Sequence, residues 1–222
     1  MRNKLLLPFT FIFLLFGMIV SYIVINNDSA LQVMLSFDSG SVYTTDDQAL
    51  LAQYVHSDRI DIQWSQLLPE YEKQILSEYQ TKQPETVSDL TEKILRSIEA
   101  SSDLDYQAAM RSTQTVSDFD GKAVSIPGFV VPIEFHPDQT PSLVFIVPYY
   151  GACIHFPPPP PNQIIFARLS PGFQLPALSE AYLFSGILNQ GLYEDPLGTS
   201  AYELAVSEIN EFIGQPDDFR SH

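Results

Sequence analysis

Basic residues are scarce in this 222-residue sequence, which has 11 lysines and arginines against 27 aspartates and glutamates and a net charge of −16. This excess of negative charge repels a phosphate backbone, so it argues against a general nucleic-acid-binding protein. It also disfavours broad contact with an anionic lipid surface. A cationic partner, a metal ion or a neutral ligand is compatible with it.

Cysteine is almost absent. Because Cys153 is the only one, no disulfide can form within the chain, and the fold depends on packing alone. Several catalytic signatures are missing too: there is no G-x-S-x-G, no phosphate-binding glycine loop and no H-E-x-x-H. The sequence therefore does not indicate an enzyme.

Charge is absent from residues 5–25, a run of 21 mostly apolar residues. A helix of this length spans about 31 Å, close to the ~30 Å of a hydrocarbon core. Because Arg2 and Lys4 precede the run and Asp28 follows it, the N-terminus is expected in the cytoplasm. The run is longer than a secretory signal core, and no A-x-A-like cleavage site follows it. We therefore predict a single-pass anchor in the inner membrane, with the C-terminal domain in the periplasm or outside the cell. Cleavage of the run as a signal is the alternative.

Two helices are predicted before a β-rich region. Pro69 is suited to the first turn of one helix, and Thr86-x-x-Asp89 has the form of a capping box at the start of the next. The only tryptophan, Trp64, is expected to pack the first helix onto the main domain. A shorter helix is predicted within residues 46–56. The second helix carries an apolar stripe formed by Leu90, Ile94, Leu95 and Ile98.

From Gly121 onward the apolar residues alternate with polar ones and β-branched residues accumulate, as is typical of strands. Gly128 and two prolines interrupt the first strand, as expected where a barrel strand bends. Five short strands after two helices predict an α+β fold, an OB-like five-stranded barrel with the helices packed outside it. A short helix is expected before Ile213. The predicted strands are Ala123–Phe135, Leu143–Pro148, Gln163–Leu169, Tyr182–Leu188 and Ser200–Ser207.

The predicted organisation has five parts along the chain. The membrane anchor comes first and the β domain forms the largest part. The parts are the anchor at 1–27, a stalk at 28–60, a helical segment packing on the barrel at 61–112, the OB-like β domain at 113–214 and a tail at 215–222.

A proline-rich stretch, here called the strap (residues 149–163), separates the second and third predicted strands. Its five successive prolines form a polyproline II rod of about 15 Å, and they lack the N–H groups that a central strand needs. The strap is either a recognition surface of preset shape or a rigid crossover at the barrel mouth. The residues proposed for recognition are Tyr149, Tyr150, Phe156, Pro157, Pro158, Pro159, Pro160, Pro161, Asn162 and Gln163.

Within the strap, Cys153 and His155 are two residues apart, so in an extended segment both side chains point to one face. Thiolate and imidazole are suitable ligands for zinc or copper, which need three or four donors. His136, at the end of the first predicted strand, is the candidate third ligand. Two alternatives remain open: a Cys153 nucleophile with a histidine base, or a buried cysteine beside a histidine bonded to a backbone carbonyl.

Several stretches resemble an exported bacterial family, the domain-of-unknown-function family 3299. They are residues 121–134, 145–149 and 151–163, the last containing the GACIH and PPPPP-NQ motif, and residues 62–69 fit the entry segment of that family. The resemblance covers about residues 60–210.

The resemblance implies an exported or lipid-anchored protein encoded near ABC-type permeases, some of them linked to zinc supply. Cys153 and His155 are the positions that match the family motif. The chain lacks a lipidation cysteine after its apolar run, so the apolar helix would be the anchor instead. The first hypothesis is therefore a membrane-anchored periplasmic accessory or binding protein that assists an ABC-type transporter or zinc homeostasis. The alternatives are a metal-free module that docks another envelope protein through the strap, and a thiol-dependent enzyme using Cys153.

Overall fold

The computed structural model describes residues 41–79, 86–152, 158–175 and 177–217, and the predicted anchor lies outside this part of the chain. Of the helices within the described residues, none is long and apolar enough to span a membrane.

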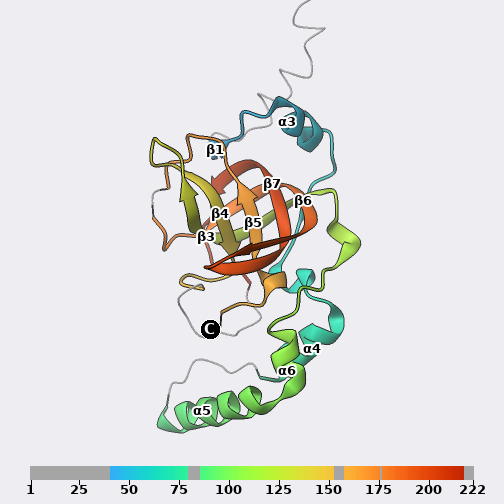
Figure 1. Cartoon of the computed structure of the whole chain (residues 1–222), viewed down its shortest axis with the longest axis vertical. Coiled ribbons are helices and arrows are strands. Elements are labelled where there is room, and N and C mark those ends of the chain that lie inside the picture. Colours follow the sequence, from blue (N-terminus) through green and yellow to red (C-terminus); the bar gives the residue numbers. More distant parts are fainter. Residues whose placement is uncertain (1–40, 80–85, 153–157, 176, 218–222) are drawn as a thin grey trace, which may run out of the picture. The chain divides into compact units, whose positions relative to one another are not determined.

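Figure 1 shows the elements. The helices are α3 (Gln48–Val55), α4 (Glu70–Glu78), α5 (Val87–Ser102) and α6 (Leu104–Ala109), with short 3-10 turns η1 (Trp64–Leu67), η2 (Ser117–Phe119) and η3 (Pro161–Gln163). The strands are β1 (Ser41–Thr44), β2 (Ile60–Asp61), β3 (Lys122–Phe135), β4 (Pro141–Val147), β5 (Ile165–Arg168), β6 (Tyr182–Asp195) and β7 (Gly198–Glu211).

Five strands close into a barrel in the order β3-β4-β5-β7-β6 and back to β3 (Figure 1). β5 and β7 run parallel, and every other neighbouring pair in the ring is antiparallel. Outside the ring, β1 pairs with β7 and β2 pairs with β3. A closed ring leaves few unpaired backbone groups at strand edges. The predicted α+β class with a five-stranded barrel is confirmed.

β3 contributes to two walls of the barrel and changes partner after Gly128. The residues up to Gly128 pair with β6, and the residues after it pair with β4. A Cβ atom at Gly128 would lie 2.7 Å from Cγ2 of Ile146 and 3.2 Å from Cζ2 of Trp64. Since real Cβ atoms do not approach a neighbour so closely, glycine lets the strand bend tightly over the core here, as the sequence predicts.

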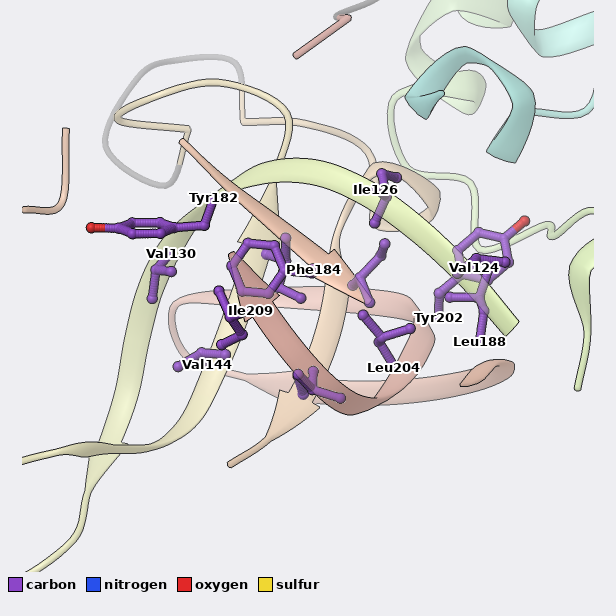
Figure 2. Packing of buried hydrophobic residues seen from close by; sticks show 14 of the residues in the cluster. Val124, Ile126, Val130, Val144, Tyr182, Phe184, Leu188, Tyr202, Leu204 and Ile209 are labelled. Carbon is purple, nitrogen blue, oxygen red and sulfur yellow. The ribbon is translucent and has the colours of Figure 1, made fainter. Parts of the chain in front are cut away.

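Apolar side chains fill the barrel interior. Along β4, Val144 and Ile146 belong to this core, whereas Phe145 between them lies on the outer face. Trp64 is fully buried in the same core, and its Nε1–H donates to the Pro127 carbonyl at 2.7 Å. Trp64 is therefore part of the barrel core, and its predicted role in packing the first helix onto the main domain stays a prediction. Figure 2 shows the interior lined also by Val124, Ile126, Val130, Tyr182, Phe184, Leu188, Tyr202, Leu204 and Ile209.

Two strands are longer than the sequence indicates. β6 and β7 each have 14 residues and form one long hairpin. The helix expected before Ile213 is wrong, because β7 continues as a strand to Glu211, where it still pairs with Tyr182. Residues 41–61 contribute β1, α3 and β2 to the same compact unit as the barrel, which begins at Gly40.

α4, α5 and α6, together called the helical arm, follow η1. α4 and α6 pack against each other through Leu76 and Ala109, and α5 contacts α6 (Figure 1). The predicted capping box at the start of α5 is confirmed, since Thr86 and Asp89 exchange side chain to backbone hydrogen bonds of 2.9 and 3.2 Å. The second of the two helices predicted to pack outside the barrel, α5, leaves its apolar stripe exposed. The exposed residues of the stripe are Leu90, Ile94, Leu95 and Ile98.

Candidate functional site

The C-terminal end of the strap is built into the fold. Asn162 and Gln163 lie in η3 and are fully buried. The Gln163 Nε2 amide donates to the Trp64 carbonyl at 2.8 Å. The Asn162 Nδ2 amide donates to Oε2 of Glu72 at 2.7 Å and to the Gln114 carbonyl at 2.9 Å. These two residues therefore connect the barrel to η1 and the helical arm.

Glu72 is an unusual buried acid. Its side chain is 1% exposed, although it lies on α4. Besides the Asn162 amide, its Oε1 accepts from the Tyr71 hydroxyl at 2.6 Å and from the Ser112 hydroxyl at 2.5 Å. A buried carboxylate is tolerated when donors surround it, and here all three donors are neutral. The hydrogen bond to Glu72 raises the pKa of Tyr71. The cluster is thus a polar joint between the helical arm and the barrel.

Tyr202 forms a second part of this joint. Its hydroxyl donates to the Leu67 carbonyl at 2.9 Å and accepts from the backbone N–H of Val116 at 2.6 Å. Burial raises the pKa of Tyr202 to about 12. The tyrosine therefore stays neutral and holds η1 and the segment after the helical arm against β7.

The strap is only partly a surface. Tyr150 is 55% exposed, with its ring 6.3 Å from that of Phe129, and Pro158 is also exposed. Pro161 is half-buried. The residues of the predicted recognition surface that the structure buries are Tyr149, Pro159, Pro160, Asn162 and Gln163. The prediction that these five residues form a recognition surface is wrong, because they are buried in the fold. Phe156 and Pro157 lie outside the described residues.

The candidate metal ligands are not brought together by the part of the chain that the structure describes. Cys153 and His155 lie outside it. His136 is half-buried, and its Nε2 is 2.8 Å from the Leu169 carbonyl oxygen, so this nitrogen carries the proton and donates. No group of three or more histidine, cysteine, aspartate or glutamate side chains suited to a metal ion occurs among residues 41–79, 86–152, 158–175 and 177–217.

The outer face of β4 and β5 is covered by the chain itself. Phe145 and Phe166 lie on this face and are buried. Tyr193, from the β6–β7 hairpin, stacks on the Phe166 ring at 3.8 Å. The Arg168 guanidinium lies 4.8 Å from the same ring, a cation–π contact. A ligand that needed this face would have to displace the hairpin.

Among the described residues, a row of exposed apolar side chains lies on α5. Five large apolar side chains on this helix are between 48% and 82% exposed. At 100° per residue they cover one side of the helix, whereas Ala100, on the opposite side, is buried. The five residues, here called the α5 stripe, are Val87, Leu90, Ile94, Leu95 and Ile98. Their spacing is visible in the sequence, but their exposure is not.

Comparison with known proteins identifies the family. The family described as "Protein of unknown function (DUF3299)" matches residues 64–211. Because this match spans more than half of the sequence, the chain belongs to that family, and the resemblance predicted from the sequence is confirmed. The chain is also similar to a DUF3299 family protein from Pseudomonas aeruginosa PAO1 whose crystal structure is known. The two share 26% identity with a TM-score of 0.50, over 71% of this chain and 99% of the other. No curated protein matches the chain.

Proposed function

We propose that this DUF3299 family member is a membrane-anchored accessory protein that works by binding another protein through the α5 stripe. The observation that carries the proposal is the exposure of that stripe, on a helix of which Ala100 alone is buried among the described side chains. Monomeric proteins rarely leave a contiguous row of large apolar side chains in water, and such rows mark interaction sites. A helix presenting residues at i, i+4 and i+8 is also a common docking element.

The net charge of the chain indicates which kind of molecule would cover the α5 stripe. A bilayer surface is a poor occupant, because acidic residues outnumber basic ones on α5 and in the whole chain, and anionic lipids repel them. A second copy of the chain is disfavoured by the same net charge of −16. The complementary occupant is therefore a protein with an apolar surface bordered by basic residues.

The uncharged run at residues 5–25 supports the location of this activity. It has the length of a membrane-spanning helix, and Arg2 and Lys4 before it favour an N-terminus in the cytoplasm. The domain that begins near Gly40 would then lie in the periplasm or outside the cell. An envelope protein such as an ABC-type permease, which the family resemblance suggested, is the partner that we propose.

The architecture of the barrel argues against nucleic-acid binding. Its strand order and its single parallel pair are those of an OB-like barrel, the finer class that we propose for it. OB-folds bind oligonucleotides on their second and third strands. In this chain those strands are β4 and β5, whose outer face is covered by Tyr193 and its hairpin.

Zinc handling remains a prediction that rests on Cys153, His155 and His136. It is tested by calorimetric titration of zinc into the intact chain, beside Cys153→Ala and His155→Ala. Submicromolar binding that both variants abolish would establish a metal site. If the folded chain does not bind zinc, zinc has no part in the function. If both variants still bind zinc, Cys153 and His155 are not its ligands. A thiol-dependent enzyme would further require Cys153 to be accessible, which alkylation of the native chain measures.

The docking proposal is tested with a double variant, Leu90→Ser with Ile94→Ser, in the full-length chain. Leu192→Ser, which changes an exposed leucine of the barrel hairpin, is the matched control. Membrane proteins that co-purify with the parent are identified, and binding is then measured with each purified partner. We expect the double variant to weaken binding at least about 100-fold, as loss of two central apolar anchors does, and Leu192→Ser to leave it unchanged. Equal binding by the parent and the double variant would contradict the proposal.

A further inference from the structure

A pocket lies between α5 and α6 of the helical arm. It has a volume of about 470 Å³ and is lined by residues of α5 and α6, by Tyr79 at the end of α4 and by Arg111 after α6. This volume is within the range of small-molecule sites. Ala100, two residues after Ile98 and about 200° further around the helix, lines the pocket. Ser97 and Ser101 also line the pocket and lie about 20° from Leu90 around the helix. The pocket therefore adjoins one edge of the stripe.

Two arginines, Arg96 and Arg111, line this pocket, and none of its lining residues is acidic. This is unusual in a chain that has only 11 basic residues. Arg111 makes no ion pair with the residues that the structure describes. Its Nε–H and Nη2–H donate to the backbone and side-chain oxygens of Gln107, both at 3.1 Å. These bonds hold the guanidinium in place and leave other N–H groups of its fork for a ligand.

Of the acids near the pocket, Glu78 and Glu99 contribute negative charge beside Tyr79, whereas Asp103 is already engaged. Asp103 accepts from the Tyr79 hydroxyl at 2.5 Å and from the N–H groups of Asp105 and Tyr106 at 2.8 and 3.0 Å. These hydrogen bonds, that from Tyr79 above all, lower the pKa of Asp103. Glu92 pairs with Arg96 at 3.2 Å, but the pair is i,i+4 and exposed to water. Exposed pairs of this kind contribute little, so an incoming anion can compete for Arg96.

The rest of the lining is largely apolar. The ring of Tyr106 packs edge-on against Tyr79, with centroids 4.9 Å apart, and Met110 and Ala100 complete this side of the pocket. We propose that the pocket binds a small amphiphilic anion, with its carboxylate or phosphate group on Arg96 and Arg111 and its apolar part against Tyr106 and Met110. Arginine suits either head group, because its planar fork can donate two parallel hydrogen bonds.

The sequence offers a direct probe of this site. Of the four methionines, at positions 1, 18, 34 and 110, only Met110 lies within the compact unit that begins at Gly40. In the intact chain labelled with ¹³C at its methionine methyl groups, the Met110 resonance is assigned by Met110→Leu. Octanoate, octyl phosphate and octylamine are then titrated in parallel, since they share an apolar tail and differ in head group.

We expect octanoate, octyl phosphate or both to shift the Met110 resonance saturably, and octylamine to leave it in place. The head group that binds more tightly identifies the ligand as a carboxylate or a phosphate. Arg111→Gln should weaken binding by at least about tenfold, since it removes a charged donor, and Arg96→Gln should do the same. Arg59→Gln is the control, because Arg59 lies elsewhere, over the ring of Tyr54. The proposal is overturned if neither anion gives a saturable shift, if octylamine shifts the resonance equally, or if Arg111→Gln binds as the parent does while remaining folded.

Discussion

The barrel and the helical arm use similar apolar residues in opposite ways. In the barrel, side chains such as Phe184 and Ile209 are buried on all sides (Figure 2). On α5, Ile94 and Ile98 of the same kind are more than half exposed. The barrel strands bury one another's apolar side chains because the ring closes, whereas α5 has an amphipathic sequence and buries only Ala100 among its described residues. The contrast shows that a strong apolar pattern predicts a face that needs covering, but does not identify what covers it.

The strongest test of this contrast compares one large apolar residue from each region. Phe184→Ala should lower the free energy of unfolding by about 3–5 kcal/mol, because it leaves a cavity in a closed core. Ile94→Ala should change it by less than about 0.5 kcal/mol, because more than half of Ile94 is exposed and no closed core surrounds it. Urea unfolding of both variants measures the difference. A large destabilisation by Ile94→Ala would mean that α5 packs its stripe within the chain.

The joint between the two regions provides the next test. Glu72→Ala leaves the Asn162 amide and the hydroxyls of Tyr71 and Ser112 without their acceptor. We expect a loss of about 3 kcal/mol in unfolding free energy, because the buried Asn162 amide loses a charged acceptor and the half-buried Ser112 hydroxyl loses its partner. A double-mutant cycle with Asn162→Ala should give a coupling of about 1–2 kcal/mol. Additive effects of the two substitutions would show that the joint does not connect the arm to the barrel.

A smaller loss is expected where β3 bends. Gly128→Ala places a methyl group 2.7 Å from Cγ2 of Ile146, so β4 or Trp64 must shift. Overpacking of this kind costs about 1–3 kcal/mol. Thermal unfolding of this variant, beside Gly121→Ala, separates crowding from backbone strain, because Gly121 has φ of 70° and open space around it. Unchanged stability of Gly128→Ala would mean that β3 has room for a side chain at this bend.

The smallest expected effect is on the pKa of a tyrosine, and the substitution that causes it leaves both regions folded. Tyr79 of the arm has a pKa raised to about 12 by its hydrogen bond to Asp103, whereas Tyr202 of the barrel reaches about 12 through burial. Asp103→Asn keeps a residue suited to the N-cap of α6 but removes the negative charge that favours neutral Tyr79. The Tyr79 pKa should then fall toward 10.0, and that of Tyr202 should stay. Alkaline absorbance titration against Tyr79→Phe and Tyr202→Phe distinguishes the two tyrosines.

Local pattern was sufficient for much of the fold. The alternation after Gly121 predicted the five strands of the barrel, and Thr86 with Asp89 predicted the start of α5. The ends of β6 and β7 were missed, because the hairpin is extended by contacts such as Tyr193 on Phe166 that join residues distant in sequence. The parallel pairing of β5 with β7 is non-local in the same way.

The candidate site was harder to predict for related reasons. Asn162 and Gln163 stood out in the sequence as part of a motif, but their partners Glu72 and Trp64 lie 90 and 99 residues earlier. A distinctive sequence motif can therefore have a structural role, as Asn162 and Gln163 have here in holding the fold together. The pocket beside Arg96 and Arg111 had no sequence signal, because two arginines 15 positions apart meet only through the packing of α5 on α6.

The central claim is that the α5 stripe is a docking surface for another protein, and site-specific photo-crosslinking in intact cells tests it most directly. A photoreactive phenylalanine analogue replaces Ile94 in the full-length chain, with Leu192 on the barrel hairpin as the control position. The account predicts an adduct from position 94 with one envelope protein, at an apolar segment bordered by basic residues, and its loss when Leu90→Ser is added. Adducts only with lipid or with a second copy of the chain, or equal adducts from position 192, would contradict it.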